Sequence, residues 1–213
     1  MRKDFNLFVE GIADKRFFEQ YLEFLFNTKI DSQRVIGCKG YTNLGTEAKD
    51  GIALRNQMIQ MTNNDGVNLV IFDADKDKEK RSEEILAWKT RYNLKFELFL
   101  LPNNKDQGAL EDLLEQIINP VNRPIFDCWE HYEQELKTTE IEGRTPPPLT
   151  TPAKKTKIYG YLEALLGESK KEKDMIKEKE RDYTCEKHWN LQSEYLEGLK
   201  SFLLKYLKTE EKL

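Results

Sequence analysis

The chain is poor in the residues that form disulfide frameworks, zinc sites and histidine-based catalytic triads. Its 213 residues include three cysteines and two histidines. Cys38, Cys128 and Cys185 are widely separated and form no CxxC pair, which argues against both a disulfide framework and a zinc site. Neither His131 nor His188 lies near the end of a predicted strand, so a histidine-based triad is not expected.

Long apolar runs and an excess of positive charge are also missing. The longest apolar runs, at residues 69–72 and 98–101, are far shorter than the roughly 20 residues of a membrane span. The first eleven residues hold no apolar stretch of signal-peptide length, so we expect a cytoplasmic protein with no membrane partner. The net charge of −4 disfavours a purely electrostatic nucleic-acid binder but allows a local basic patch.

The first half of the chain alternates short apolar runs with longer amphipathic segments. This alternation is typical of parallel strands joined by helical crossovers. We therefore predict an α/β fold with a central parallel sheet of about four strands flanked by helices. Strands are predicted at residues 6–9, 34–37, 68–72 and 95–101, and helices at 13–26, 43–61, 78–91 and 109–118.

The pattern changes beyond Pro120. Residues 123–132 carry aromatic side chains without a clear helical period, and residues 144–152 hold four prolines and are expected to form an extended loop. We divide the chain into an α/β core, residues 1–118, and a mostly helical C-terminal extension, residues 119–213, that packs on the same core. The extension is predicted to contain helices over 155–166 and 191–207, and a charge-dense helix or mobile lobe, exposed to solvent, over 168–181.

Acidic residues follow three of the four predicted strands. Glu10 ends the first strand, Asp73 and Asp75 follow the third, and Glu111 and Asp112 come after the fourth by way of a loop. Ligands of open parallel α/β sheets bind beyond the carboxyl ends of the strands, and several carboxylates in one pocket repel unless a cation neutralises them. Oxygen ligands without histidine or cysteine favour Mg²⁺ or Mn²⁺ over zinc. The sequence thus predicts a divalent-metal site.

A plainer alternative is that these acids only cap helices. Short Asp-x-Asp strings are common in solvated turns, where an aspartate caps the next helix, and Asp14 lies at a helix start where it could be an N-cap. Two features favour the metal site: the apolar strand before Asp73, and the Glu10-Gly11 pair at another strand end. Residues two apart in an extended chain point the same way, which would let Asp73 and Asp75 face one ion.

The arrangement resembles the Toprim domain, the metal-binding module of bacterial-type primases, type IA and type II topoisomerases, small ribonuclease-like proteins and OLD-family nucleases. The resemblance covers residues 5–118, and within this group the chain is most similar to the OLD-type nucleases and to stand-alone bacterial Toprim-like proteins of unassigned function. It implies a Toprim-like, Rossmann-like sheet. The residues that carry it are Glu10-Gly11 with Asp14-Lys15, the strand 69–72 running into Asp73-Ala74-Asp75, and the turn Cys38-Lys39-Gly40-Tyr41.

The same resemblance suggests two further site residues. Glu111 is similar to the position where the OLD branch supplies another acidic ligand at the head of a helix, with Asp112 as the alternative. Lys157 is similar to a lysine at the start of a later helix in that branch. Lys155 and Lys154 also fit, and a basic loop beside the proline-rich segment is the alternative to any site lysine.

The resemblance implies a divalent-metal-dependent phosphodiester hydrolase, a nuclease acting on DNA or RNA, with DNA expected over RNA as its partner. Glu10, Asp73, Asp75 and Glu111 would ligate Mg²⁺ or Mn²⁺, Glu10 could instead act as general base, and Lys157 would stabilise the transition state. No G-x-x-x-x-G-K-[ST] phosphate loop is present, so an ATPase like that of OLD enzymes would be a separate partner chain. The alternative is a catalytically silent module that holds metal and a nucleotide or nucleic acid for a partner. The sequence leaves the oligomeric state open.

Overall fold

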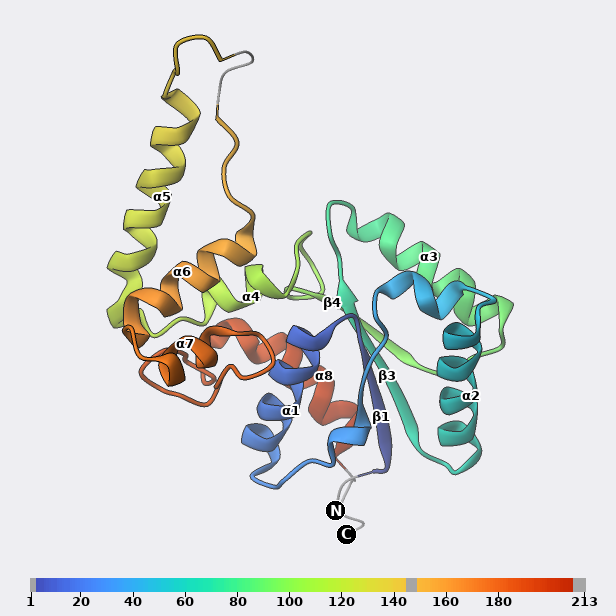
Figure 1. Cartoon of the computed structure of the whole chain (residues 1–213). Coiled ribbons are helices and arrows are strands. Elements are labelled where there is room, and N and C mark those ends of the chain that lie inside the picture. Colours follow the sequence, from blue (N-terminus) through green and yellow to red (C-terminus); the bar gives the residue numbers. More distant parts are fainter. Residues whose placement is uncertain (1–2, 145–148, 209–213) are drawn as a thin grey trace.

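The computed structural model describes residues 3–144 and 149–208, which form one parallel sheet and the helices around it (Figure 1). The strands are β1 (Phe5–Val9), β2 (Val35–Gly37), β3 (Val67–Asp73) and β4 (Glu97–Leu101). The α-helices are α1 (Ile12–Phe26), α2 (Lys49–Asn63), α3 (Lys78–Arg91), α4 (Leu110–Gln116), α5 (Arg123–Thr138), α6 (Lys154–Leu166), α7 (Lys170–Ile176) and α8 (Glu197–Leu207). Short 3-10 helices are η1 (Ser32–Arg34), η2 (Tyr41–Gly45), η3 (Pro120–Asn122) and η4 (Glu194–Leu196).

The four strands are all parallel and lie in the order β2-β1-β3-β4, which confirms the predicted α/β class. Side chains along a strand alternate between the two faces of the sheet. Leu7 and Leu69 therefore enter one apolar core, while Phe8 and Val70 enter the other. Helices α1 and α8 cover the first face, and α2 and α3 cover the second (Figure 1).

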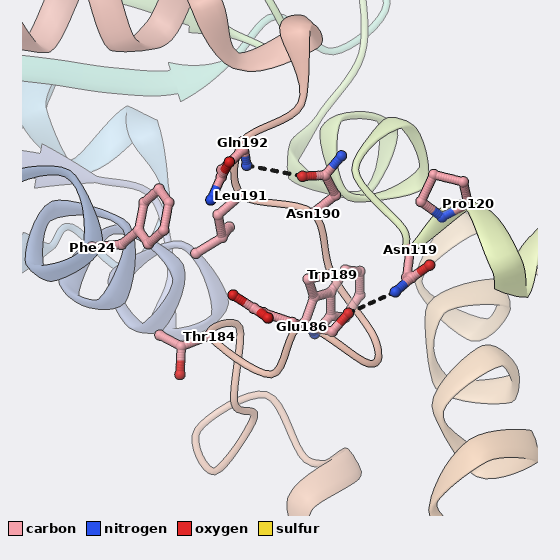
Figure 2. Close-up of a pocket in the computed structure, with 9 residues that line it drawn as sticks. All are labelled: Phe24, Asn119, Pro120, Thr184, Glu186, Trp189, Asn190, Leu191 and Gln192. Atoms are coloured by element: carbon pink, nitrogen blue, oxygen red, sulfur yellow. Dashed lines mark hydrogen bonds between the residues drawn. The ribbon is translucent and has the colours of Figure 1, made fainter.

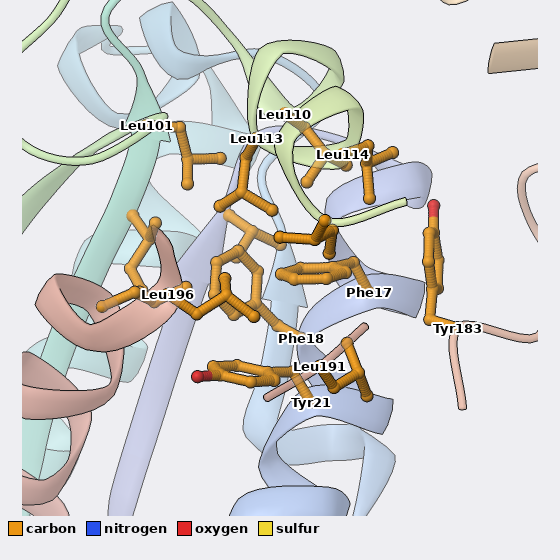
Figure 3. Close-up of a cluster of buried hydrophobic side chains, with 14 of the residues drawn as sticks. Phe17, Phe18, Tyr21, Leu101, Leu110, Leu113, Leu114, Tyr183, Leu191 and Leu196 are labelled. Atoms are coloured by element: carbon orange, nitrogen blue, oxygen red, sulfur yellow. The ribbon is translucent and has the colours of Figure 1, made fainter. Parts of the chain in front are cut away.

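The helices beyond Pro120 share the core on the first face. The buried cluster that contains the strand residues also includes Tyr161 of α6, Leu203 of α8 and, from the segment before α8, Trp189. In Figure 3 the leucines of α4 pack over the aromatic side chains of α1, including Phe17. Each fully buried side chain of this size contributes roughly 1.5–3 kcal/mol to the free energy of folding. The two predicted parts of the chain, 1–118 and 119–213, thus contribute to one core.

The predicted helix over residues 43–61 is wrong over residues 43–48, which precede α2. The chain forms η2, passes through an extended link and only then enters α2. Gly45 of η2 packs closely against α3, since a Cβ there would lie 2.2 Å from the ring of Trp88. Arg55 of α2 then donates hydrogen bonds to the carbonyl oxygens of Leu44 and Thr46, at 2.9 and 2.7 Å. These bonds hold the link against the helix instead of continuing it.

Two predictions in the C-terminal half also need correction. Residues 123–132, which showed no clear period, lie within α5, which extends away from the sheet in Figure 1. The charge-dense stretch 168–181 contains α7, but it is not fully solvated, because Ile176 and Arg181 are buried. Of the predicted proline-rich loop, residues 145–148 lie outside the described residues.

The absence of a membrane span is predicted from the short apolar runs of the sequence. None of the helices in the described ranges combines the length and apolar character needed to cross a bilayer.

Candidate functional site

The end of β1 and the end of β3 meet at one edge of the sheet. The strands pair in parallel, with Val9 opposite Ile71, so Glu10 lies beside the end of β3. The Glu10 carboxylate accepts a hydrogen bond from the backbone N–H of Asp73 at 3.0 Å, and its side chain is only 17% exposed. The Asp73 carboxylate in turn accepts the backbone N–H of Leu110 at 3.0 Å. Asp73 thereby joins β3 to the start of α4.

Asp75 lies on a tight turn, not in the extended chain that would let Asp73 and Asp75 point the same way. Its φ of 52° is in the left-handed region, which aspartate tolerates better than most residues. Two backbone hydrogen bonds of 2.8 Å join Asp75 to Gly108, just before α4. The turn leaves the Asp75 side chain 54% exposed. Asp73 and Asp75 therefore differ in burial, and Asp75 faces solvent at the rim of the site.

Arg81 of α3 supplies the positive charge closest to these acids. Its guanidinium group contacts the Glu10 carboxylate at 3.5 Å and forms an ion pair with Asp75. The side chain is only 8% exposed, and the guanidinium lies 3.2 Å from the centre of the Tyr41 ring. Arg81 is not among the site residues that the sequence pattern predicts. Arg81 belongs to a run of alternating charges that is typical of a solvated helix face, and its partner Glu10 is 71 residues away.

Asp14 adds a further buried carboxylate to the site. One oxygen accepts the backbone N–H of Gly11 at 3.0 Å, at the start of α1. The other oxygen is buried and has no hydrogen-bond partner among the residues that the structure describes. Asp14 is thus the third residue of the helix, not its N-cap as the alternative interpretation supposed. Its second oxygen points to a missing partner, since buried polar atoms are normally hydrogen-bonded.

The structure separates the roles of Glu111 and Asp112. Asp112 accepts the backbone N–H of Ala109 at 2.8 Å, and its other oxygen forms an ion pair with Lys154. Glu111 instead interacts electrostatically with Asp14 and Asp73. The preferred prediction, Glu111, is therefore the acid of this pair that belongs with the strand-end carboxylates, while Asp112 caps α4.

Burial, together with mutual repulsion, raises the pKa values of Glu10, Asp14 and Asp73. Burial is the main cause for Glu10, whose pKa rises from 4.5 to about 7 despite the lowering effects of the Asp73 N–H and Arg81. Burial also raises the pKa of Asp73, and the negative charges of Asp14, Glu10 and Glu111 raise it further. The pKa of Asp14 is raised as well, again chiefly by burial. The cluster therefore favours any additional cation, or protons in its place.

The predicted lysine, Lys157, is not brought to these acids. Its buried ammonium group pairs with Glu115 at 2.6 Å and with Glu130 at 3.6 Å. Lys155, which the sequence left as an alternative, pairs with Glu178 at 3.0 Å and interacts electrostatically with Glu111. Lys155 and Lys157 are two residues apart on α6, so their side chains leave the helix on different sides. Of the two, Lys155 is the one that interacts electrostatically with Glu111.

The acids do not converge on one point in this conformation. Within residues 3–144 and 149–208, no group of three or more acidic, histidine or cysteine side chains is arranged to hold a metal ion. The hydrogen bonds explain this: Glu10 and Asp73 face backbone N–H groups, and Asp75 faces Arg81. The donor set still suits a hard cation, because every donor is a carboxylate oxygen. Within this cluster, the second oxygen of Asp14 is buried and has no hydrogen-bond partner among the described residues.

Comparison with known proteins assigns the chain to a family. Residues 4–208 match the family described as "Protein of unknown function (DUF3226)". The chain belongs to the DUF3226 family. No curated protein and no solved structure matches it. The DUF3226 match spans both the sheet and the later helices, so Glu10, Asp73, Glu111 and Lys155 all lie within it. The resemblance to Toprim and OLD-type nucleases is not tested by these comparisons and stays a prediction.

Several hollows lie on the surface of this DUF3226 protein, and two of them lie beside the end of β3 and the end of α1. One, of about 390 Å³, adjoins the acidic site and is lined by Tyr41, Ala74, Asp75, Lys76, Asp77, Lys80, Arg81 and Glu84. The other, of about 320 Å³, lies between the end of α1 and the segments around residues 119–120 and 184–192 (Figure 2). There Asn119 donates to the carbonyl oxygen of Glu186 at 2.7 Å. None of the predicted site residues lines this second hollow.

Proposed function

We propose that the chain is a Mg²⁺- or Mn²⁺-dependent phosphodiester hydrolase of the Toprim and OLD type, acting on DNA or RNA, with DNA the expected partner. The observation that carries this proposal is the cluster of carboxylates at one sheet edge. Glu10, Asp14 and Asp73 are mostly buried there, with pKa values raised by burial and by one another. The same cluster contains a buried carboxylate oxygen with no partner among the described residues. A divalent cation would relieve both costs.

The residues that would hold the metal are Asp73, Glu111, Asp75 and Glu10, with the second oxygen of Asp14 close to the same cluster. A bound Mg²⁺ or Mn²⁺ would supply positive charge to the phosphate and to the departing oxygen. Binding requires the side chains to turn from their present N–H and guanidinium partners. Such rotations are local, because the backbone positions are fixed by β1, β3 and α4.

Two residues of the chain suit the proton and charge requirements of hydrolysis. Glu10, whose pKa is about 7 in the metal-free protein, is the candidate general base if it does not itself ligate the metal. Lys155 lies in electrostatic contact with Glu111 and could stabilise negative charge on the phosphate. These roles replace the predicted role of Lys157, whose ammonium group is occupied by Glu115.

A second candidate function is a catalytically silent module that binds metal and nucleic acid for a partner. The ion pairs of Arg81 with Glu10 and Asp75 favour it, because they tie up two carboxylates that a nuclease would use. In either case a cytoplasmic location and a separate ATPase partner remain parts of the proposal. They follow from the sequence and from the family resemblance.

The decisive experiment is a cleavage assay on single- and double-stranded DNA and RNA, with Mn²⁺, Mg²⁺ or EDTA. A nuclease should cleave with metal, and Asp73→Asn should abolish cleavage while the fold is retained. Glu79→Gln is the matched control, because Glu79 is acidic and near the site but 80% exposed. Metal binding without cleavage of any substrate would support the silent module. Absence of both would refute the two proposals together.

A further inference from the structure

We propose that Arg81 is the exchangeable cation of this site. It neutralises Glu10 and Asp75 while no metal is bound, and it binds a phosphate of the nucleic-acid strand once a divalent metal has taken these carboxylates. This inference rests on the proposed function, because it assumes that the acids bind a metal. It adds a phosphate-binding residue that no motif in the sequence indicates.

The first support is how Arg81 is held. Its backbone N–H donates to the carbonyl oxygen of Asp77 at 3.0 Å, which fixes its position in the first turn of α3. Among residues 3–144 and 149–208, the guanidinium group is held by the carboxylates of Glu10 and Asp75 and by the face of the Tyr41 ring. The backbone is therefore anchored, while the charged end of the side chain depends on partners that a metal would also use.

Competition follows from the shared oxygen atoms. Oε1 of Glu10 already accepts the N–H of Asp73 at 3.0 Å and lies 3.5 Å from Arg81. A divalent ion bound to the same carboxylates would repel the guanidinium group and remove its partners at once. Because Asp75 is more than half exposed, its pair with Arg81 opens toward solvent without disturbing the core.

The hollow beside Asp75 gives the released guanidinium group a place and a ligand. Lys76, Lys80 and Arg81 all line it. Two of its acids are engaged: Asp77 accepts the N–H of Lys80 at 3.0 Å, and Glu84 accepts the hydroxyl of Tyr41 at 3.4 Å. When Asp75 binds the metal, the basic side chains of the hollow outnumber its remaining acidic ones. The planar guanidinium group can then donate two hydrogen bonds to the oxygens of a phosphate.

The test measures Mn²⁺ affinity by calorimetry for the wild type, Arg81→Gln and Lys80→Gln. Arg81→Gln should bind Mn²⁺ roughly tenfold more tightly, because a competing charge-assisted contact is lost. Lys80→Gln removes the same charge from the same hollow, but not from the ion pairs with Glu10 and Asp75. It should change the affinity by less than about threefold. Equal gains in the two variants, or none in Arg81→Gln, would overturn the exchange.

Binding of a labelled oligonucleotide in Ca²⁺ tests the phosphate step. Arg81→Gln should bind roughly tenfold more weakly despite its tighter metal binding, because one charge-assisted phosphate contact is lost. Arg91→Gln, at the far end of α3 and paired with Glu47, should bind like the wild type. Unchanged affinity in Arg81→Gln would refute the phosphate role.

A second variant covers the case in which Arg81→Gln does not fold. Tyr41→Leu removes the ring under the guanidinium group, leaves every carboxylate in place and should also tighten Mn²⁺ binding. Trp88 stacks on Tyr41, with ring centres 5.8 Å apart, so its fluorescence should change when Mn²⁺ releases Arg81. Failure of the wild type to bind Mn²⁺ would overturn the proposed function and the exchange together. Binding with a Trp88 signal that stays constant would overturn the exchange alone.

Discussion

Replacing Glu10 with glutamine should stabilise the metal-free protein increasingly as the pH rises above about 4.5. The pKa of Glu10 is raised from 4.5 to about 7, so its ionised form is disfavoured in the folded state. Its contribution to stability is therefore greatest below pH 4.5 and is lost as pH rises toward 7. Glutamine keeps an oxygen acceptor for the Asp73 N–H but has no proton to lose.

The magnitude follows from the two pKa values. At about 1.4 kcal/mol per pH unit, moving the pKa from 4.5 to about 7 corresponds to about 3 kcal/mol. Glu10→Gln should thus match the wild type near pH 4 and exceed its free energy of unfolding by about 3 kcal/mol at pH 8. In a chain of this size, such a difference corresponds to roughly 10 °C in Tm.

Urea unfolding in EDTA between pH 4 and pH 8 checks this prediction. Glu79→Gln is the control, because its exposed carboxylate should leave the difference from the wild type independent of pH. Saturating Mn²⁺ should reverse the order at pH 8 by stabilising the wild type more than Glu10→Gln, since binding to the native state adds to its stability. A Glu10→Gln protein with the same pH dependence as the wild type would refute the assignment of the buried charge to Glu10.

Three further predictions concern residues around the cluster. Lys157→Met should lower the free energy of unfolding, measured in urea, by about 3 kcal/mol, because it leaves Glu115 without its buried partner. Lys155→Met should lower it by under about 1 kcal/mol, because Lys155 is exposed in its ion pair with Glu178, and should instead slow cleavage. Glu111→Gln should weaken Mn²⁺ binding in calorimetry, while Asp112→Ala should leave it unchanged and cost about 1 kcal/mol, because the Ala109 N–H loses its side-chain acceptor. Gly160→Ala should cost about 1–3 kcal/mol, because its Cβ would lie 2.6 Å from Trp129, while Gly198→Ala, with 3.9 Å to its nearest contact, should be neutral or stabilising.

The sheet was predictable because its strands are apolar on both faces. A continuous run such as residues 68–72 is typical of a strand buried on both sides, and β3 contains it. The helix predicted at 78–91 also has the observed bounds of α3. The helical spacing of Phe126, Trp129 and Glu133 in α5 was present too. In the structure α5 extends from the body and buries Phe126 alone among its residues, so its amphipathic pattern is not matched by a buried face.

Contacts between distant segments were beyond the sequence pattern. Nothing in the run around Arg81 distinguishes it from its exposed neighbours, since its burial depends on Tyr41 and Glu10 arriving from other elements. The close packing of Gly45 against Trp88 likewise joins two distant segments. Local periodicity predicts which face of an element is apolar, but it does not show which charged residue lies under a neighbouring loop.

Asp14 and Asp112 differ in how well helix capping, the simpler alternative to a metal site, explains them. Each is the third residue of its helix, and each accepts the N–H of the residue before the helix, Gly11 or Ala109. Capping accounts for Asp112 completely, because its other oxygen meets Lys154 in solvent. It accounts for only half of Asp14, whose other oxygen is buried without a partner among the described residues. A helix cap requires no such oxygen, whereas a cation bound among Asp14, Asp73 and Glu111 would use it.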